Sequence, residues 1–373
     1  MRKIVSLVPV GLLIACSLFA APPSVPLSEK GTSKEPQIQL AIHDPKLPLV
    51  VVVATGGTIA EKRSAKTGGS VPALSGTDLV AAVPELSKFA NIGVVNFSNI
   101  DSSHMAPENW AKLSRTVDRV LAKPEVTGVV VTHGTDTMAE GSFFLDLTLK
   151  SNKPVVFTGA MRDASSPAPD GPGNILDAVT QVISKNATNW GVTVTLNQYV
   201  NAAQYVRKTQ TTNVQTFESG EKGYLGYVFN GEVTRFNDCL KRRKIPLTEP
   251  LPSVSFLTTY AGDDGRFVRY AVDRGAKGIV IDSLGAGNVN AKTFEAVLYA
   301  LSKQIPVVIT SIVWEGSVEP SYGDVGGGAD LLKHGCILFR PEDLGGPKAR
   351  ILLMVALAKY GNDTKKLQEI FNY

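Results

Sequence analysis

The chain has 373 residues, 43% of them apolar and 19% charged, and its 38 basic and 34 acidic side chains leave a formal charge of +4. This composition excludes a disordered chain and a small disulfide-stapled scaffold. At roughly 100–200 residues per domain, the length predicts about two domains. The only dense basic run covers residues 241–244, and we expect it to be a solvated linker between domains. With no other basic cluster and a small net charge, the sequence predicts no nucleic-acid binding.

The N-terminal residues predict export. Arg2 and Lys3 precede an apolar run over 4–15, which is too short to span a bilayer but suits a secretory signal. The run ends at Cys16 in a sequence that resembles the lipobox of bacterial lipoproteins. We expect a signal peptide over 1–15, lipid on Cys16 as the only membrane attachment, and a flexible tether over 16–47. The alternative is cleavage near residues 20–21, which gives a soluble periplasmic protein.

From residue 48 onward, short apolar runs alternate with helical patterns. The continuous apolar runs predict buried parallel strands over 49–54, 126–132, 154–158 and 192–196. Apolar residues at helical spacing predict helices over 107–121, 138–149 and 173–182. Asn230-Gly231 between alternating apolar residues predicts a hairpin over 224–236. Together these elements predict a large N-terminal α/β domain over 48–236, with a doubly wound, mostly parallel sheet.

A charged, proline-rich stretch over 237–252 predicts the boundary between two domains. Beyond it, the same patterns predict a smaller C-terminal α/β domain over 253–373. Its expected strands are 254–258, 278–282 and 306–313, and its expected helices are 293–301 and 349–358. Whether Cys239 and Cys336 form a disulfide stays open.

Polar residues follow two of the predicted strands directly. Ligands bind at the carboxyl ends of parallel strands, so these residues are candidates for a site. Thr55-Gly56-Gly57-Thr58 follows the first strand; its glycines allow a sharp turn, and we expect Thr55 to point into the crevice. The run over 129–131 leads toward Thr135 and Asp136. A threonine hydroxyl needs a base to become a nucleophile, and Lys208 is the candidate.

Residues 54–60 and 133–137 resemble the two signature motifs of the bacterial-type L-asparaginase family, which includes periplasmic asparaginases and glutaminase-asparaginases. Further segments resemble the family in the same order: 99–105, 158–162, 170–172, 208–212, 223–231 and 287–290. The resemblance covers the chain from about residue 49 to its C-terminus.

The resemblance implies a role for each matching residue. Thr55 is the nucleophile that forms an acyl-enzyme, and Thr135 is a second essential threonine with Lys208 as its base partner. Asp136 receives the α-amino group of the substrate, and Ser102 binds the α-carboxylate. The remaining implied substrate contacts are Gly57, Ser103, the backbone N–H groups of Ala160 and Thr135, Asn290, and an acidic residue of a neighbouring subunit, for which we favour Asp324 over Glu319.

The implied reaction is hydrolysis of L-asparagine to L-aspartate and ammonia by a homo-oligomer, expected to be a tetramer, with glutamine as a candidate second substrate. We expect no cofactor, and the scattered histidines predict no metal site. Members of the family usually carry a tyrosine in a lid beside the nucleophile. No tyrosine occurs here between Glu61 and Leu74, and Gly69 aligns with that position. The group that activates Thr55 therefore stays open, and Tyr322 of a partner subunit is one hypothesis.

Two rival functions fit parts of the pattern. A lipid-anchored solute-binding protein for amino acids also has two α/β domains, but it has no need of Thr55, Thr135 and Lys208 together. Within the enzyme class, the alternative is a glutaminase or a broader ω-amidase.

Overall fold

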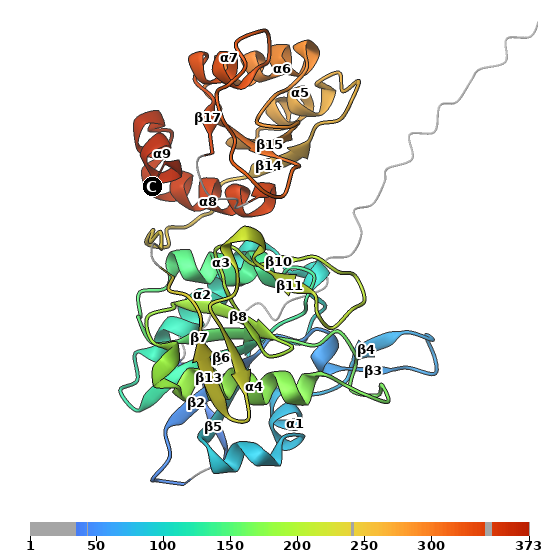
Figure 1. Ribbon diagram of the computed structural model, residues 1–373, viewed down its shortest axis with the longest axis vertical. Coiled ribbons are helices and arrows are strands. Elements are labelled where there is room, and N and C mark those ends of the chain that lie inside the picture. The colour runs from blue at the N-terminus through green and yellow to red at the C-terminus, as the bar shows by residue number, and fades with distance from the viewer. Residues whose placement is uncertain (1–34, 43, 240–241, 340–344, 373) are drawn as a thin grey trace, which may run out of the picture. The chain divides into compact units, whose positions relative to one another are not determined.

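A nine-stranded sheet forms the centre of the N-terminal domain in the computed structural model, which describes residues 35–42, 44–239, 242–339 and 345–372 (Figure 1). Its strand order is β1-β5-β2-β6-β7-β8-β9-β12-β13. The five strands from β5 to β8 run parallel, whereas β1, β9, β12 and β13 pair antiparallel. The strands are β1 Gln39–Ile42, β2 Leu49–Ala54, β5 Asn91–Asn96, β6 Val126–Thr132, β7 Val155–Thr158, β8 Val192–Leu196, β9 Tyr199–Ala202, β12 Gly226–Phe229 and β13 Glu232–Arg235.

The order of the parallel strands makes the carboxyl ends of β2 and β6 the expected place for a ligand. Along the chain these strands occur as β2, β5, β6, β7 and β8, but β5 and β6 lie on opposite sides of β2 in the sheet. The connections therefore diverge at β2, which makes its carboxyl end the topological switch point where ligands bind in such sheets. The doubly wound, mostly parallel sheet that the sequence predicted is confirmed, as are its four predicted strands to within one residue.

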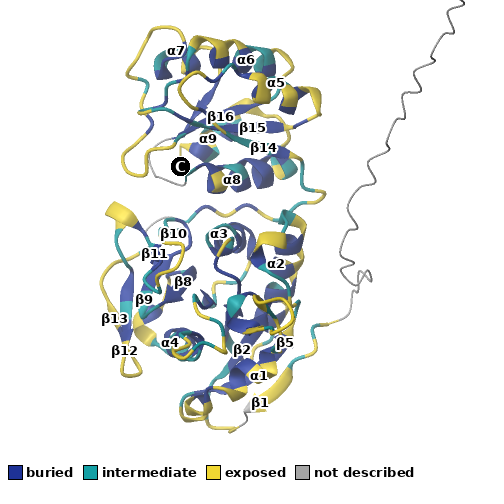
Figure 2. Ribbon diagram, turned by 90° about the vertical axis from the view of Figure 1, so that its right-hand side faces the viewer, coloured by how far each residue is buried: buried dark blue, intermediate teal, exposed yellow. Residues whose placement is uncertain are grey.

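Helices cover both faces of this sheet (Figure 2). Val50 and Val52 pack toward α1 and α4, whereas Val51 and Val53 pack toward α2 and α3, because successive side chains of a strand point to opposite faces. All four valines are fully buried. Because both faces of β2 are covered, its sequence is a continuous apolar run rather than an alternating one. The helices are α1 Gly76–Ala81, α2 Pro107–Leu121, α3 Met138–Thr148 and α4 Gly171–Ile183.

The C-terminal domain has its own parallel sheet, in the order β14-β15-β16-β17. The cluster of buried residues on one face comes from α5, α6 and α7, and α8 and α9 supply apolar residues to the other face. Its elements are β14 Val254–Thr258, α5 Arg266–Asp273, β15 Gly278–Ser283, α6 Ala291–Ser302, β16 Val307–Ser311, α7 Gly328–Lys333, β17 Ile337–Leu338, α8 Gly345–Tyr360 and α9 Thr364–Phe371. This confirms the predicted smaller α/β domain.

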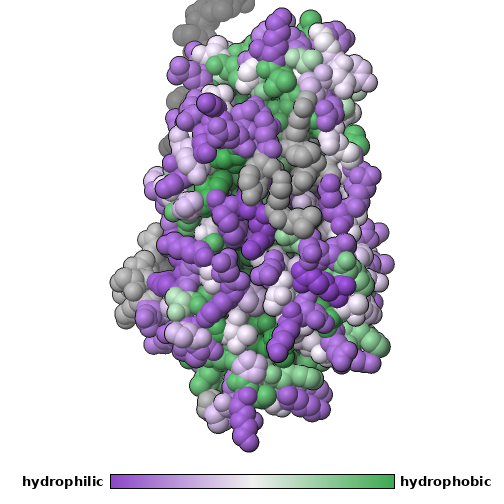
Figure 3. Space-filling model, turned by 60° about the vertical axis from the view of Figure 1, so that its left-hand side comes forward, coloured by the Kyte–Doolittle hydropathy of each residue, from purple (hydrophilic) through white to green (hydrophobic). Residues whose placement is uncertain are grey.

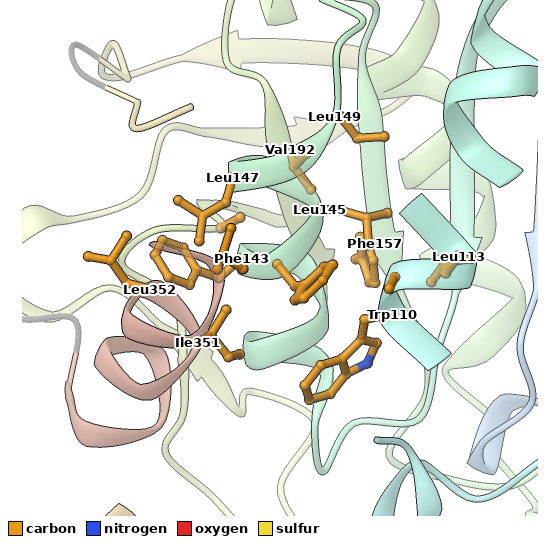
Figure 4. Packing of buried hydrophobic residues seen from close by; sticks show 14 of the residues in the cluster. Trp110, Leu113, Phe143, Leu145, Leu147, Leu149, Phe157, Val192, Ile351 and Leu352 are labelled. Atoms are coloured by element: carbon orange, nitrogen blue, oxygen red, sulfur yellow. The ribbon is translucent and has the colours of Figure 1, made fainter. Parts of the chain in front are cut away.

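Helix α3 of the N-terminal domain packs against α8 of the C-terminal domain. Phe143 on α3 lies beside Ile351 and Leu352 on α8, and all three side chains are buried (Figure 4). One hydrophobic cluster therefore runs from the first sheet, through α3 and α8, to the second sheet.

The basic run before β14 is not the solvated linker that its charge predicted. Arg242 and Lys244 lie 3.5 and 3.8 Å from the carboxylate of Asp146, whose side chain is 3% exposed. Arg243 is 5% exposed, and its Nε donates to the carbonyl of Ile370. A buried carboxylate requires cationic partners, and Asp146 lies on α3. The ion pairs with Arg242 and Lys244 therefore hold the linker against α3.

A short hairpin, β3 Glu61–Arg63 and β4 Ser70–Pro72, projects from the N-terminal domain directly after the glycine-rich turn (Figure 1). Elsewhere the face seen in Figure 3 is mostly hydrophilic, with apolar side chains scattered between polar ones. Among the described residues, no helix combines the length and hydrophobicity needed to cross a bilayer. Cys239 and Cys336 do not form a disulfide with each other. The predicted signal peptide and Cys16 lie outside the described residues.

Candidate active site

The two glycines after β2 allow two loops to meet at the switch point. Gly56 and Gly57 have φ values of 106° and 85°, a region that disfavours other residues. A Cβ on Gly57 would lie 2.3 Å from Cα of Gly134, so the two backbones pack directly against each other. This contact brings the turn after β2 against the loop after β6, which carries Thr135 and Asp136.

Lys208 links this loop to a distant part of the chain. Its Nζ lies 2.9 Å from Oγ1 of Thr135 and 2.6 Å from Oδ1 of Asp136. The strand that carries Lys208, β10 Arg207–Lys208, pairs with β11 Phe217–Glu218. Thr135 is 6% exposed, whereas the side chain of Asp136 is 58% exposed. The arrangement joins a buried hydroxyl to an ammonium group and leaves part of the carboxylate open to a ligand.

Thr55 does not point into the crevice, contrary to the sequence-based expectation. It is 0% exposed, and its Oγ1 donates to the carbonyl of Thr132 at 2.9 Å. Its backbone N–H donates to the same carbonyl at 3.1 Å, which extends the β2–β6 ladder by one residue. The hydroxyl of Thr55 is thus held within the sheet by the strand geometry.

Thr58 is the threonine at the open side of the glycine pair. It begins the 3₁₀ helix η1 Thr58–Ala60 and is only partly buried. Its hydroxyl has no hydrogen-bond partner within the described part of the chain. Since Gly57 packs on Gly134, the backbones that lead into Thr58 and Thr135 lie next to each other. Thr55 and Thr58 stand on either side of the same two glycines, so the motif alone does not show which of the two faces the site.

Two backbone N–H groups at this edge lack an acceptor. Thr135 follows β6, and Ala160 follows β7, the next strand. Both residues are buried, and neither N–H has a hydrogen-bond acceptor among the residues that the structure describes. A buried N–H without an acceptor is uncommon in folded proteins, and two at one edge can bind an oxygen with developing negative charge.

Ser102 lies in the same loop cluster. A Cβ built on Gly134 would lie 2.5 Å from Oγ of Ser102, and the carbonyl of Ser102 accepts from the hydroxyl of Thr137 at 2.9 Å. Ser103 is exposed beside it, and its N–H donates to Asp101. The hydroxyl of Ser102 is thus close to the backbone that carries Thr135.

Glu61 is an acidic residue of this site that sequence reasoning missed. It is 6% exposed, and burial, together with the nearby carboxylates of Asp101, Asp163 and Asp136, raises the pKa of its carboxyl. His133, next to the site, is fully buried, and burial lowers its pKa to about 4, so it stays neutral at ordinary pH. No group of three His, Cys, Asp or Glu side chains in the described segments is placed to hold a metal ion.

The structure does not bring the predicted C-terminal residues to this cluster within one chain. Asn290 caps α6: its Oδ1 accepts from the N–H of Thr293 at 3.0 Å, and its Nδ2 donates to the carbonyl of Asp263 at 2.8 Å. Asp324 is exposed in the loop before α7. In the described part of the chain, neither side chain forms a hydrogen bond with Thr135 or Lys208.

Comparisons with known proteins identify the family. Residues 49–240 match the model "Asparaginase, N-terminal", and residues 253–371 match "Glutaminase/Asparaginase C-terminal domain". L-asparaginase 2 of Bacillus subtilis is 34% identical over 92% of this chain and 91% of its own length. The probable periplasmic L-asparaginase of Haemophilus influenzae is 36% identical over 87% of this chain and 93% of its own.

A solved structure agrees with these matches. The probable cytoplasmic L-asparaginase of Campylobacter jejuni superimposes with a TM-score of 0.78 at 37% identity, covering 87% of this chain and 100% of that one. The resemblance noted from the motifs is therefore confirmed across both domains. The chain belongs to the L-asparaginase family of amidohydrolases.

Proposed function

We propose that this chain hydrolyses the side-chain amide of L-asparagine to L-aspartate and ammonia through a threonine acyl-enzyme. The observation that carries the proposal is the position of Nζ of Lys208, 2.9 Å from the Thr135 hydroxyl and 2.6 Å from Asp136, at the switch-point crevice. The names of the relatives from Bacillus subtilis and Haemophilus influenzae support the same reaction.

Thr58, rather than Thr55, is the nucleophile that the geometry supports. Attack on an amide carbon requires an oxygen that the substrate can approach within about 3–3.5 Å. Thr55 is fully buried and its hydroxyl donates to Thr132, whereas Thr58 is a partly exposed residue. The role that the family resemblance suggested for Thr55 therefore passes to Thr58 in this proposal.

The proposed reaction has two halves. As the Thr58 oxygen attacks the amide carbon, the Thr135 hydroxyl, with Lys208 as its base partner, takes the Thr58 proton. The amide oxygen that becomes negative accepts hydrogen bonds from the N–H groups of Thr135 and Ala160, each worth about 3 kcal/mol. The same pair delivers that proton to the amide nitrogen as the C–N bond breaks, and ammonia leaves. In the second half, the pair takes a proton from the water that attacks the ester and returns it to the Thr58 oxygen as the ester bond breaks.

Charged groups of the substrate supply orientation. We assign the α-ammonium to Asp136, whose exposed carboxylate has an oxygen beyond the one that contacts Lys208. The α-carboxylate is assigned to Ser102, with Gly57 and Ser103 lining the approach. Anchoring both charged groups holds the distal amide against the reacting hydroxyl, which is where most of the rate advantage of positioning arises.

Glutamine is the proposed second substrate. Ser103 is exposed and has a short side chain, so it leaves space beside the α-substituents for a longer amide.

The remaining contacts, Asn290 and Asp324, are proposed to come from a neighbouring subunit of a homo-oligomer, expected to be a tetramer. Sedimentation velocity tests the assembly, and a monomer with full turnover would contradict it.

Export with lipid on Cys16 is the proposed localisation. The basic and apolar residues over 2–15 support it, and the Haemophilus influenzae relative is named as periplasmic, although the Campylobacter jejuni protein is named as cytoplasmic. Labelling with radioactive palmitate tests it: the wild type should be labelled and Cys16→Ala should not. Release of an unlabelled protein cleaved near residues 20–21 would favour ordinary secretion.

Steady-state ammonia release from asparagine and from glutamine tests the function itself. The account predicts one ammonia and one aspartate per asparagine consumed, with no added metal or cofactor. Binding of asparagine without turnover would instead favour a solute-binding protein, and faster turnover of glutamine would favour a glutaminase.

A further inference from the structure

A lysine of the C-terminal domain is buried against the N-terminal domain. Lys348, in the first turn of α8, is 3% exposed. Its Nζ donates to three backbone carbonyls of the other domain, those of Ala203, Gln204 and Val206, at 2.8, 3.0 and 2.6 Å. Three acceptors match the three N–H bonds of an ammonium group, so the lysine is fully used.

The three carbonyls belong to a buried segment of the N-terminal domain. Ala203, Gln204 and Val206 are 1%, 2% and 0% exposed, and they lie between β9 and β10, outside any strand. Removing the donor from a buried carbonyl costs about 1–3 kcal/mol, so loss of the Lys348 ammonium should destabilise the path of this segment.

This segment leads directly into the site. Val206 is two residues before Lys208, whose Nζ contacts Thr135 and Asp136. The neighbouring Arg207 contacts the C-terminal domain as well: its Nη1 donates to the carbonyl of Trp314 at 3.1 Å. Groups of the C-terminal domain thus help to hold the chain up to Lys208, together with hydrogen bonds of its own domain such as that from the N–H of Val206 to the carbonyl of Ala202.

The surroundings of Lys348 favour a fixed position over a mobile one. Phe143 packs between the two domains, with its ring 5.8 Å from Nζ of Lys348, and its neighbours on α8 are Ile351 and Leu352 (Figure 4). Burial lowers the pKa of Lys348 well below its ordinary value, with Arg207 adding to the effect, while Glu140 and Asp146 oppose it. A buried ammonium group is stable only with hydrogen-bond acceptors, and the buried carbonyls are stable only with donors, so each stabilises the other.

We propose that Lys348 is a positioning residue, which holds the Ala203–Val206 segment so that Lys208 meets Thr135. The inference rests on the proposed function for its catalytic consequence, but its structural part does not. It makes the C-terminal domain part of the catalytic apparatus without any contact between Lys348 and substrate.

Lys348→Met tests the proposal, because methionine has similar length and no donor. We expect kcat for asparagine to fall by about 100-fold, as for a catalytic group displaced by about 1 Å, while KM changes less than about 3-fold. The matched control is Lys153→Met, which removes another lysine bound to a backbone carbonyl, that of Lys123 at 2.8 Å, near the amino ends of β6 and β7. We expect wild-type kcat for this control.

A double-mutant cycle separates positioning from general stability. In a Lys208→Met background, Lys348→Met should lower the residual kcat no further, because the group that it positions is gone. An equal loss in both backgrounds, or wild-type kcat in the single variant, would overturn the proposal. Lys348→Gln, which keeps two neutral donors, carries the same test if the Met variant does not fold; if neither folds, the role is stability and the proposal fails.

Hydrogen exchange distinguishes failure of this inference from failure of the proposed function. Backbone amides of residues 203–208 should exchange faster in Lys348→Met than in the wild type or Lys153→Met, whether or not the protein releases ammonia. If the wild type has no amidase activity, the function fails and the exchange comparison alone judges Lys348. Unchanged exchange in this segment would overturn the positioning role.

Discussion

Nζ of Lys208 lies 2.9 Å from Oγ1 of Thr135, although 73 residues separate them along the chain. The contact depends on two unrelated features, the loop at the carboxyl end of β6 and the two-residue strand β10. Neither feature needs the other for its own local structure. Their meeting is a property of the tertiary fold, and the proposed proton transfer depends on it.

Removing either member of this pair should abolish most of the activity. We predict that Thr135→Val and Lys208→Met each lower kcat for asparagine by about 1000-fold or more, because each breaks the same proton path. The double variant should be no worse than the singles, since residues that act as a unit are not additive. Lys222→Met, an exposed lysine on a nearby turn, is the control and should keep wild-type kcat. Losses that add would contradict the shared path.

The contact between Gly57 and Gly134 predicts a second effect. Gly57→Ala should lower both kcat and Tm, because the new Cβ would lie 2.3 Å from Cα of Gly134 and φ is 85°. We expect a loss of about 100-fold in kcat, from displacement of the loop that carries Thr135. Gly69→Ala is the matched control, since nothing lies within 4 Å of its Cβ position. Equal kcat in the two variants would show that the packed glycine backbones do not matter.

Asp177 on α4 predicts a dependence of stability on pH. Burial raises its pKa from 3.8 to about 7. The stability that the folded state gains by holding this proton is fully present below pH 3.8 and is lost as the pH rises through about 7. Asp177→Asn has no charge to bury, so its Tm should exceed that of the wild type at pH 8 by about 3 °C or more, and the gain should vanish near pH 3.5.

Asp264→Asn provides the control for that measurement. Asp264 is partly exposed, and hydrogen bonds from Arg266 lower its pKa to about 2, so its charge is favourable in the folded state. This variant should not raise Tm at pH 8. A gain for Asp177→Asn that is the same at both pH values would mean that ionisation is not the cause.

The strands of the parallel sheet were predictable because burial on both faces leaves a simple pattern. β2, β6 and β8 match the predicted residues throughout, since each consists mainly of valine, threonine and leucine. β5 was missed because its sequence, Asn-Ile-Gly-Val-Val-Asn, mixes polar residues and glycine with a short apolar core. Helix α5 was also missed, since most of its residues face solvent.

The site was predictable as a set of loops but not as a set of side-chain directions. The alternation of strands and helices predicts a parallel sheet, so the loops after β2 and β6 were expected at its carboxyl ends. Whether Thr55 or Thr58 faces the crevice depends on where the β2–β6 ladder ends, one residue beyond β2. The linker charges were misjudged for a related reason: their partner, Asp146, is buried in a helix far away in the sequence.

The most direct test of the account compares the two threonines that flank the glycine pair. Steady-state ammonia release from asparagine should fall by about 1000-fold or more in Thr58→Val and recover in part in Thr58→Ser, which restores a hydroxyl. Thr55→Val should lower Tm, through loss of the hydrogen bond to Thr132, but keep kcat within about 10-fold of the wild type. The opposite result, full turnover in Thr58→Val and none in folded Thr55→Val, would contradict the account.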